Sequence, residues 1–245
     1  MIEIIVKAAQ EAGKKILEIY NQDFEVFQKA DESPLTKADQ EAHQVIEAFL
    51  KTTNIPVLSE EGKSIPYEER KNWKQFWMVD PLDGTKEFVK KNGEFTVNIA
   101  LIENQKPIMG VVYAPVKGWM YIGDAILGAY KLDLAPDATF DLSHLTDESK
   151  LPKAPDSSVF KIVGSRSHAS EETELFIAAL QKKHGNVDFV SMGSSLKLCL
   201  VAEGAANIYP RLAPTMEWDT AAGHAVCTAA GKKVQIYKTD SDVLY

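Results

Sequence analysis

The sequence predicts a mixed α/β (α+β) fold, and three observations lead to this class. Two amphipathic helix patterns fill about the first 50 residues, strand patterns follow one another up to about residue 122, and strand and helix patterns alternate after residue 159. The chain has 245 residues, of which 45% are hydrophobic and 25% are charged. This composition is typical of a globular protein with a substantial core, in one large domain or in two closely packed lobes.

The first two elements are predicted as helices. Apolar residues recur at helical spacing in residues 3–20, which predicts an amphipathic helix there. Ser33 and Pro34 then interrupt the pattern, and Thr36 followed by Asp39 resembles a capping box at the start of a second helix. Asp39 is therefore expected in the first turn of that helix.

A largely antiparallel sheet is predicted next. Residues 55–58 and 76–79 are short apolar runs that each end in acidic residues, a pattern typical of strands that deliver side chains to a site. Apolar and polar residues alternate in residues 95–101, and further strands are expected at residues 108–113 and 119–122. The first part of the chain is thus two helices followed by a sheet.

The second part of the chain is predicted as an α/β lobe. Residues 132–158 are rich in Asp, Ser, Pro and Lys, so they are interpreted as a poorly packed connecting excursion between an N-terminal lobe of residues 1–131 and a C-terminal lobe of residues 159–245. Strands and helices alternate beyond it. The expected strands cover residues 161–163, 187–190, 206–209 and 234–237, and the expected helices cover residues 170–182, 194–203 and 219–230.

Charge and cysteine content argue against several classes of function. Thirty-five acidic residues against 27 basic residues give a formal charge of -8, which repels a nucleic-acid backbone or an anionic membrane. Cys199 and Cys227 have neither the spacing of a zinc site nor that of a disulfide framework. No run of 18 apolar residues and no signal peptide are found, so a cytoplasmic location is expected. A peripheral position at the cytoplasmic face of the inner membrane is the alternative, and the sequence does not define the oligomeric state.

The segment from Asp80 to Phe88, Asp-Pro-Leu-Asp-Gly-Thr-Lys-Glu-Phe, is the strongest candidate for chemistry. Magnesium in proteins commonly binds one or two carboxylates together with water and substrate phosphate. Asp80 and Asp83 can hold such ions side by side, with the Leu82 carbonyl as a further ligand. Gly84 permits close approach of a phosphate, which the backbone amides face if a helix starts there. The structural alternative is an ordinary Asp-Gly turn with solvated acidic side chains.

Three separated segments resemble the inositol monophosphatase superfamily of lithium-sensitive, magnesium-dependent phosphatases. They are residues 80–88, Ser59-Glu60-Glu61, and residues 218–225 (Trp-Asp-Thr-Ala-Ala-Gly-His-Ala). Glu87 stands where inositol monophosphatases usually carry Asn; with residues 193–197 (Gly-Ser-Ser-Leu-Lys) and 209–211 (Tyr-Pro-Arg) it is similar to the bisphosphate nucleotidase branch. The resemblance implies the layered αβαβα sandwich of inositol monophosphatase and fructose-1,6-bisphosphatase.

The resemblance also implies a set of metal ligands. Two or three Mg²⁺ ions would be bound by the side chains of Glu60, Asp80, Asp83 and Asp219 and by the carbonyl of Leu82. Glu60 is preferred to Glu61 because it aligns with the ligand of the family, although both residues could form a solvated acidic turn. Asp219 precedes an Ala-rich helix, so its structural alternative is a helix N-cap.

The mechanism that the resemblance implies is in-line attack on the phosphate by metal-activated water. Asp39 and Thr85, together with Glu60, resemble the residues that orient and deprotonate that water; for Asp39 the capping box is the structural alternative. Because cations and backbone amides neutralise the phosphate charge, no protein nucleophile is required. Haloacid-dehalogenase phosphatases differ, since their Asp-x-Asp-x-Thr motif separates the carboxylates by one residue and supplies an aspartyl nucleophile.

The expected substrate is a small phosphorylated nucleotide. By resemblance, adenosine 3',5'-bisphosphate would be split to AMP and phosphate, and 3'-phosphoadenylyl sulfate is a further candidate in sulfur metabolism. A second phosphate needs cationic or hydrogen-bonding groups beyond the metals. The residues expected to contact the substrate are Glu60, Leu82, Asp83, Gly84, Thr85, Ser165, His168, Gly193, Lys197, Arg211 and Asp219. The alternatives are an inositol or sugar phosphatase of the same superfamily and a non-catalytic nucleotide- or metal-binding protein.

Overall fold

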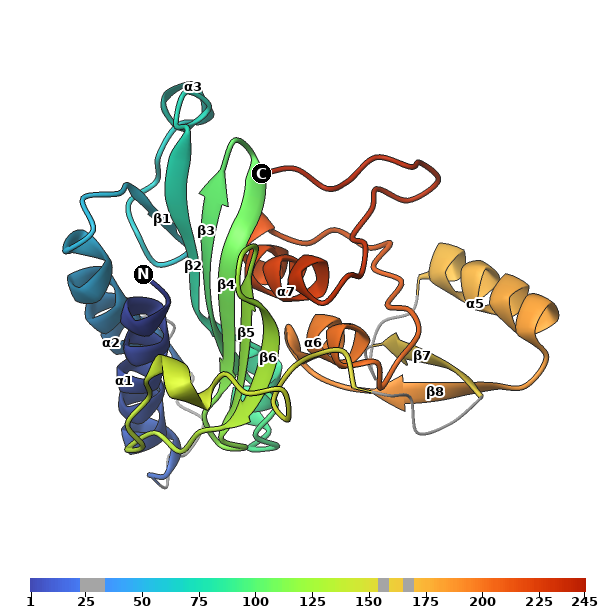
Figure 1. Ribbon diagram of the computed structural model, residues 1–245, viewed down its shortest axis with the longest axis horizontal. Helices are drawn as coiled ribbons and strands as arrows, with labels where there is room; N and C mark the ends of the chain where they lie inside the picture. Colours follow the sequence, from blue (N-terminus) through green and yellow to red (C-terminus); the bar gives the residue numbers. More distant parts are fainter. Residues whose placement is uncertain (23–33, 154–158, 165–169) are drawn as a thin grey trace.

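The elements of the chain form five layers (Figure 1). The structure is a computed structural model that describes residues 1–22, 34–153, 159–164 and 170–245. From one side to the other, the layers are helices α1 (Ile2–Tyr20) and α2 (Pro34–Lys51), a six-stranded sheet, helices α6 (Leu196–Glu203) and α7 (Glu217–Ala229), a sheet of β7 (Phe160–Gly164) and β8 (Val187–Ser191), and helix α5 (Glu171–His184). The predicted αβαβα sandwich is confirmed.

The six strands of the large sheet follow one another in chain order. They are β1 (Val57–Ser59), β2 (Gln75–Asp83), β3 (Thr96–Glu103), β4 (Lys106–Ala114), β5 (Trp119–Asp124) and β6 (Gly128–Asp133). β1 pairs with β2 in parallel, and every later pair is antiparallel. The sequence does not predict β6, because Lys131 interrupts its short apolar pattern. In the structure this lysine forms an ion pair of 2.9 Å with Glu203 of α6.

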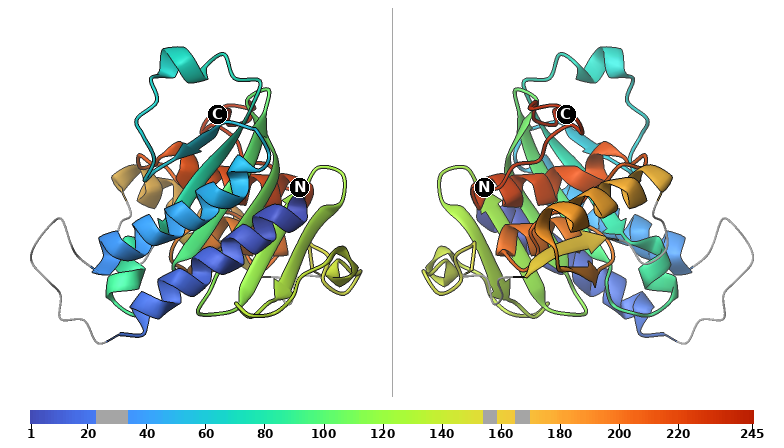
Figure 2. Two further views of the ribbon diagram at one scale, coloured as in Figure 1. Left: turned by 90° about the vertical axis from the view of Figure 1, so that its left-hand side faces the viewer. Right: turned by 90° about the vertical axis from the view of Figure 1, so that its right-hand side faces the viewer.

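Helices α1 and α2 lie side by side on one face of the large sheet (Figure 2, left). Their apolar faces pack against the strands in a core whose members include Ile5, Ile16, Ile46 and Trp77. α2 begins at Pro34. Proline is favoured at this first position because its missing N–H would have no intrahelical partner there. The predicted capping-box start at Thr36 and Asp39 is therefore wrong, since both residues lie inside the helix.

Helix α7 packs unusually close to the opposite face of the large sheet. A Cβ atom at Gly123 of β5 would lie 2.5 Å from Cα of Val226, and one at Gly110 of β4 would lie 2.7 Å from the carbonyl oxygen of Ala222. Contacts that short are possible only because glycine has no side chain. Helix α7, from the second part of the chain, thus packs directly against β4 and β5 from the first part.

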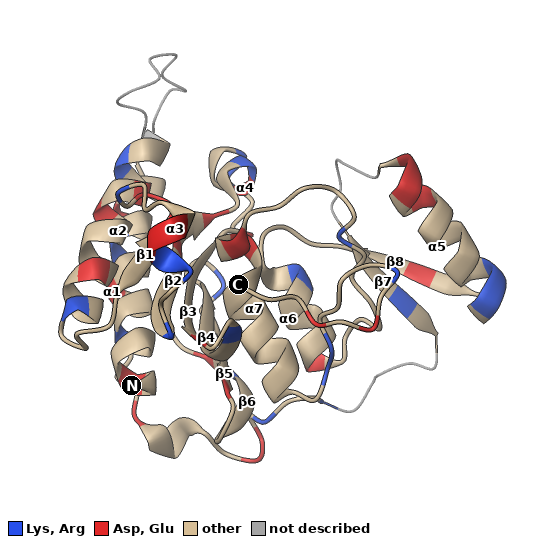
Figure 3. Cartoon of the chain, turned by 90° about the horizontal axis from the view of Figure 1, so that it is seen from above, with Lys and Arg blue, Asp and Glu red and all other residues tan. Residues whose placement is uncertain are grey.

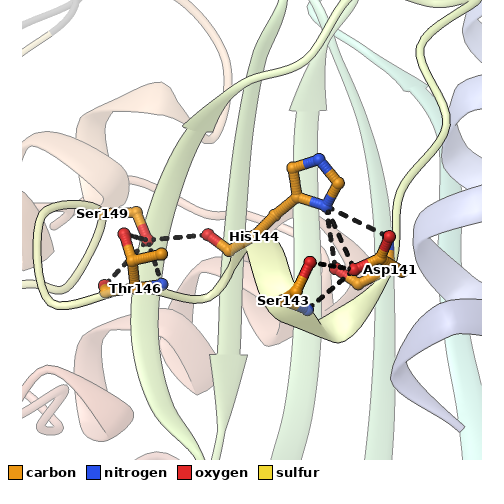
Figure 4. Close-up of polar contacts among 5 residues, drawn as sticks. All are labelled: Asp141, Ser143, His144, Thr146 and Ser149. Atoms are coloured by element: carbon orange, nitrogen blue, oxygen red, sulfur yellow. Dashed lines mark hydrogen bonds and ion pairs between the residues drawn. The ribbon is translucent and has the colours of Figure 1, made fainter.

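Most side chains of residues 134–153 are exposed, and two buried leucines attach the segment to the core. Leu134 and Leu151 are each only 4% exposed. Between them, local hydrogen bonds close the turns (Figure 4): the Asp141 carboxylate accepts hydrogen bonds from the backbone N–H and the hydroxyl of Ser143, at 2.8 and 2.5 Å. The interpretation as a poorly packed connecting excursion stays a prediction, and the polar side chains of this segment satisfy neighbouring backbone groups.

Two of the strands expected in the second part of the chain are reduced to isolated bridges. These bridges join Ile162 to Ile208 and Gln235 to Asp242. An apolar run becomes a strand only where a neighbouring backbone offers a continuous ladder, which the sequence pattern does not reveal. The division into two lobes at residues 132–158 stays a prediction. Within the described residues, no helix combines the length and the apolar character needed to span a membrane.

Candidate active site

An irregular end of β2 brings two acidic side chains together. Asp80 pairs with Asn98 of β3 and Asp83 pairs with Thr96. Between these two pairs the chain advances three residues along β2 but only two residues along β3. In a regular strand, side chains three residues apart point to opposite faces of the sheet. Pro81 cannot donate to the ladder, and the extra residue forms a bulge that redirects Asp83. The proline in the motif therefore lets both carboxylates face one point.

Asp80, Asp83 and Asp219 form the acidic cluster of the site. One carboxylate oxygen from each residue lies within 4.8 Å of the others. Asp80 is only 1% exposed. Its burial, followed by the charges of Asp83 and Glu60, raises the pKa of the Asp80 carboxyl well above its usual range. An all-oxygen set of converging carboxylates fits a hard divalent cation, whose charge would offset this repulsion.

Asp219 enters the cluster from the first turn of α7. The helix begins at Glu217 and its N-cap is Met216, so the interpretation of Asp219 as the N-cap is wrong. Its Oδ2 instead accepts hydrogen bonds from the Met216 backbone N–H (3.0 Å) and from the Thr215 hydroxyl (2.6 Å). The Asp219 side chain therefore hydrogen-bonds the backbone at the start of α7 and also belongs to the acidic cluster. Seen from above, acidic residues mark the start of α7 near α4 (Figure 3).

Glu60 and Asp39 lie at the edge of the cluster. Glu60 follows β1, and its backbone N–H donates to the carbonyl oxygen of Val79 at 3.1 Å. Burial of its carboxyl group, and then the charge of Asp219, raise the pKa of Glu60, while a hydrogen bond with Asp80 opposes the shift. On α2, burial and the charges of Glu61 and Glu60 raise the pKa of Asp39 to about 8. The buried Oδ1 of Asp39 has no hydrogen-bond partner.

The turn after β2 provides a close approach to the cluster. Gly84 has a left-handed backbone (φ +96°), and a Cβ there would lie 3.1 Å from Cα of Phe95. Helix α4 (Thr85–Val89) starts immediately after it, as the predicted phosphate-binding turn requires. Thr85 is exposed at its first position. The side chain of Leu82, between the two aspartates, is buried in the core and anchors the bulge.

The opposite wall comes from the second part of the chain. Lys197 is only 8% exposed, and its ammonium group donates to the Ser194 carbonyl oxygen at 2.5 Å. Burial lowers the pKa of Lys197, although the charge of Asp83 opposes this. The backbone N–H of Gly193 donates to Glu94 Oε2 at 2.9 Å. Arg211, which is exposed, donates to the carbonyl oxygen of Pro214 at 2.9 Å. Ser165 and His168, also expected here, lie outside the described residues.

A cavity of about 300 Å³ joins these two walls. Seven of the residues expected to contact the substrate line it: Asp83, Gly84, Thr85, Gly193, Lys197, Arg211 and Asp219. Ser194, Ser195 and Tyr209 also line it. The acidic wall could hold a cation, and the basic wall could hold an anionic group of a ligand.

Four polar residues beside the cluster have no role in the sequence prediction. Thr96 and Asn98 are 0% and 1% exposed on β3, and Ser194 and Ser195 are 9% and 4% exposed before α6. The two serines lie in the segment 193–197 that resembles the family, but the resemblance assigns no role to either. The available signal was a pair of polar side chains two positions apart on a strand that directly follows the acidic motif.

Fold and site together define a class: a layered α/β enzyme whose cavity sets a carboxylate cluster, suited to divalent cations, against basic side chains. The chain belongs to the inositol monophosphatase family, whose model matches residues 1–244.

Relatives with a known name are similar in sequence to this chain over most of its length. A protein of Shigella flexneri named 3'(2'),5'-bisphosphate nucleotidase CysQ is 47% identical over 239 residues, which cover 96% of this chain and 89% of the relative. A protein of Haemophilus influenzae with the same name is 35% identical over 224 residues, which cover 90% and 78%. The crystal structure of CysQ from Bacteroides thetaiotaomicron has 52% identity and a TM-score of 0.93, covering 99% of this chain and 90% of that one.

A more distant structure shares the fold alone. The inositol monophosphatase from Zymomonas mobilis is 21% identical with a TM-score of 0.70, and the match covers 94% of this chain and 83% of that one. The layered architecture is thus kept at low sequence identity.

Proposed function

We propose that this protein is a magnesium-dependent phosphatase that hydrolyses adenosine 3',5'-bisphosphate to AMP and phosphate. The observation that carries the proposal is the convergence of Asp80, Asp83 and Asp219 beside a cavity whose other wall carries Lys197 and Arg211. The names of the relatives, which are bisphosphate nucleotidases at 47% and 35% identity, support this substrate over other phosphate esters.

The ligands that we propose for two or three Mg²⁺ ions are Glu60, Asp80, the Leu82 carbonyl, Asp83 and Asp219. Bound Mg²⁺ would lower the pKa of a water molecule and neutralise phosphate charge. The chain supports this role by placing converging carboxylates in a setting where burial and mutual repulsion raise the pKa of Asp80 and Glu60. Such groups gain from a nearby cation, because it favours their ionised form.

Asp39 and Thr85 are proposed to orient and deprotonate the attacking water, with Glu60 beside them. Asp39 fits this role because its Oδ1 is buried without a partner and is free to accept a proton. Its pKa of about 8 describes the site without cations. A cation nearby lowers that pKa, so the carboxylate is ionised and able to act as a base near neutral pH. Thr85 begins α4, a helix in contact with the α2 helix of Asp39.

The second phosphate of the substrate is proposed to contact the basic wall. Lys197 and Arg211 supply positive charge there, and Ser165, His168 and Gly193 are proposed as further contacts. Because the Gly193 N–H already donates to Glu94, we expect Gly193 to contact another part of the nucleotide rather than its phosphate. 3'-Phosphoadenylyl sulfate carries a similar pair of anionic groups, so we propose it as a second substrate. The cytoplasmic location stays a prediction.

Phosphate release tests this proposal directly. Adenosine 3',5'-bisphosphate, 3'-phosphoadenylyl sulfate, inositol 1-phosphate and fructose 1,6-bisphosphate would be compared with and without MgCl2, and with added LiCl. We expect turnover of the nucleotides to exceed that of the inositol and sugar esters, to require Mg²⁺ and to be inhibited by Li⁺. Fastest turnover of inositol 1-phosphate or fructose 1,6-bisphosphate would replace the proposed substrate. Tight nucleotide binding without phosphate release would indicate a binding protein.

The Asp83→Asn variant tests the metal role. We expect kcat to fall by at least about 100-fold, since even residues that only support a metal ligand cost about 10- to 100-fold. Asp124→Asn is the matched control, because Asp124 is a buried carboxylate (7% exposed) that accepts hydrogen bonds from Ile126 and Leu127 N–H groups in the β5–β6 turn. Full activity of Asp83→Asn would reject the proposed metal site.

A further inference from the structure

One oxygen of the Asp83 carboxylate is saturated by hydrogen bonds from the loop before α6. Oδ2 accepts from the Ser195 backbone N–H at 2.7 Å, from the Ser195 hydroxyl at 2.9 Å and from the Ser194 hydroxyl at 2.5 Å. A carboxylate oxygen offers about two lone-pair directions, and the Ser195 N–H and the Ser194 hydroxyl are already enough to fill them, so Oδ2 has no capacity for a further ligand. The other oxygen, Oδ1, is then the one that can face the cavity.

This loop is itself held by two side chains of β3. The Asn98 amide donates to the Ser195 hydroxyl at 2.8 Å, and its own oxygen accepts from the Thr96 hydroxyl at 2.9 Å. Thr96 also lies 2.5 Å from the Ser194 hydroxyl. All four residues are at most 9% exposed. These contacts hold Ser194 in a left-handed backbone conformation (φ +53°) that costs free energy in any residue other than glycine.

Ser195 also reaches the third member of the acidic cluster. Its hydroxyl lies 2.8 Å from the backbone carbonyl oxygen of Asp219, in position to donate to it. The hydroxyl has a single proton, which Asp83 Oδ2 and the Asp219 carbonyl share, and it accepts one hydrogen bond from Asn98. The Ser195 side chain thus contacts Asp83 at the end of β2, Asp219 at the start of α7 and Asn98 of β3.

We propose that Ser195, supported by Asn98, is a positioning residue that fixes the separation of the Asp83 and Asp219 carboxylates. It holds Oδ2 of Asp83, which would leave Oδ1 of Asp83 to bind a cation, and it holds the turn of α7 that carries Asp219. This inference rests on the proposed function, because it takes both aspartates to be ligands of Mg²⁺. Ser195 acts only through those two residues and touches no reacting atom.

Magnesium binding to variants of the full chain tests the proposal. The variants are Ser195→Ala, Asn98→Leu and the double variant; calorimetric titration with MgCl2 gives Kd, and the Mg²⁺-induced rise in Tm gives a second readout independent of activity. We expect each single variant to raise Kd for Mg²⁺ by about 10-fold or more. Because both residues act along one hydrogen-bonded path, the double variant should be no weaker than the weaker single variant.

Tyr121→Phe is the matched control for the loss of a buried hydrogen bond. Tyr121 is 0% exposed, and its hydroxyl donates to Glu203 at 2.9 Å. We expect this variant to lower Tm while leaving Kd for Mg²⁺ unchanged, which separates a general loss of stability from loss of positioning.

The opposing results are distinct. Wild-type Mg²⁺ affinity in Ser195→Ala or, should that variant fail to fold, in Asn98→Leu would overturn the positioning role while leaving the proposed function intact. Additive losses in the double variant would also overturn it. Absence of Mg²⁺ binding in the wild-type protein would instead remove the proposed metal site, and this inference with it.

Discussion

Asp39, Glu60 and Asp80 share one property: each has a carboxyl pKa raised above its usual range, with burial as the largest cause. In the absence of cations, the folded protein therefore binds protons at these groups more tightly than the unfolded chain does. Where the unfolded state holds fewer protons than the folded state, the free energy of unfolding falls as pH rises. For Asp39, this loss of stability covers the pH interval between the ordinary pKa of 3.8 and the raised pKa of about 8.

The pH dependence of stability follows from this sign. In a chelating buffer, we expect Tm of the wild-type protein to fall steadily from pH 5 to pH 8. Asp39 alone contributes a slope on the order of 1 kcal/mol per pH unit in that range. Asp39→Asn should flatten the dependence, because an amide does not titrate. Thermal denaturation at several pH values measures it.

Two comparisons make the test specific. Asp124→Asn, which replaces a buried carboxylate in the β5–β6 turn, controls for the loss of a carboxylate outside the acidic cluster. Added MgCl2 should reduce the slope of the wild-type protein, because a cation favours the ionised carboxylates. Equal slopes in the wild type and in Asp39→Asn would show that Asp39 does not titrate in this range.

At the scale of elements, an ion pair joins the loop between β1 and β2 to the start of α7. Arg70, at the end of the short helix α3 (Tyr67–Arg70), donates to both carboxylate oxygens of Glu217, at 3.2 and 2.7 Å. The loop begins with Glu60, and Glu217 stands two residues before Asp219. The paired geometry restrains direction as well as distance. It therefore connects two elements that carry proposed metal ligands.

Breaking this pair should affect metal binding modestly. The side chains of Arg70 and Glu217 are 19% and 36% exposed, and partly exposed pairs contribute about 1 kcal/mol or less. We expect Arg70→Gln to raise the Mg²⁺ concentration for half-maximal activity by about fivefold or less. Lys71→Gln is the control, because Lys71 pairs with Glu68 inside the same loop. Identical Mg²⁺ dependence in the two variants would contradict a role for the ion pair.

The elements also show what the sequence could predict and where it failed. Helical periodicity predicts α1, whose buried residues recur at helical spacing. The alternation of apolar and polar residue types predicts β3, although nearly all of its residues are buried in the structure. The sequence indicates Asp80 and Asp83 because they are close together and follow an apolar run, whereas the roles of Glu60, Asp39 and Asp219 come from the resemblance to the family. Asn98 was missed, because a polar residue on a strand normally faces water. Here the loop of Ser195 covers that face, and a contact between residues so distant in sequence leaves no local pattern.

At the scale of the whole molecule, the acidic cluster joins parts of the chain that are far apart in sequence. Asp80 and Asp83 end a strand of the large sheet, and Asp219 lies on α7, which Gly110 and Gly123 allow to pack tightly against that sheet. Without a cation, burial and the charge of Asp83 disfavour the ionised form of Asp80, so gathering these groups opposes this packing. A bound cation would reverse the sign of that interaction and act as a cross-link.

Hydrogen exchange measured by mass spectrometry can detect such a cross-link. We expect MgCl2 to slow amide exchange in peptides that contain residues 58–62, 80–86 and 215–221, because opening any of these segments would expose the cation to loss. Peptides from α5, which lies in the outermost layer beyond the small sheet (Figure 2, right), should exchange at the same rate with and without Mg²⁺. KCl at equal ionic strength controls for screening of charge. Protection confined to residues 80–86 would mean that the cation is held by β2 alone, and α7 would then have no part in binding it.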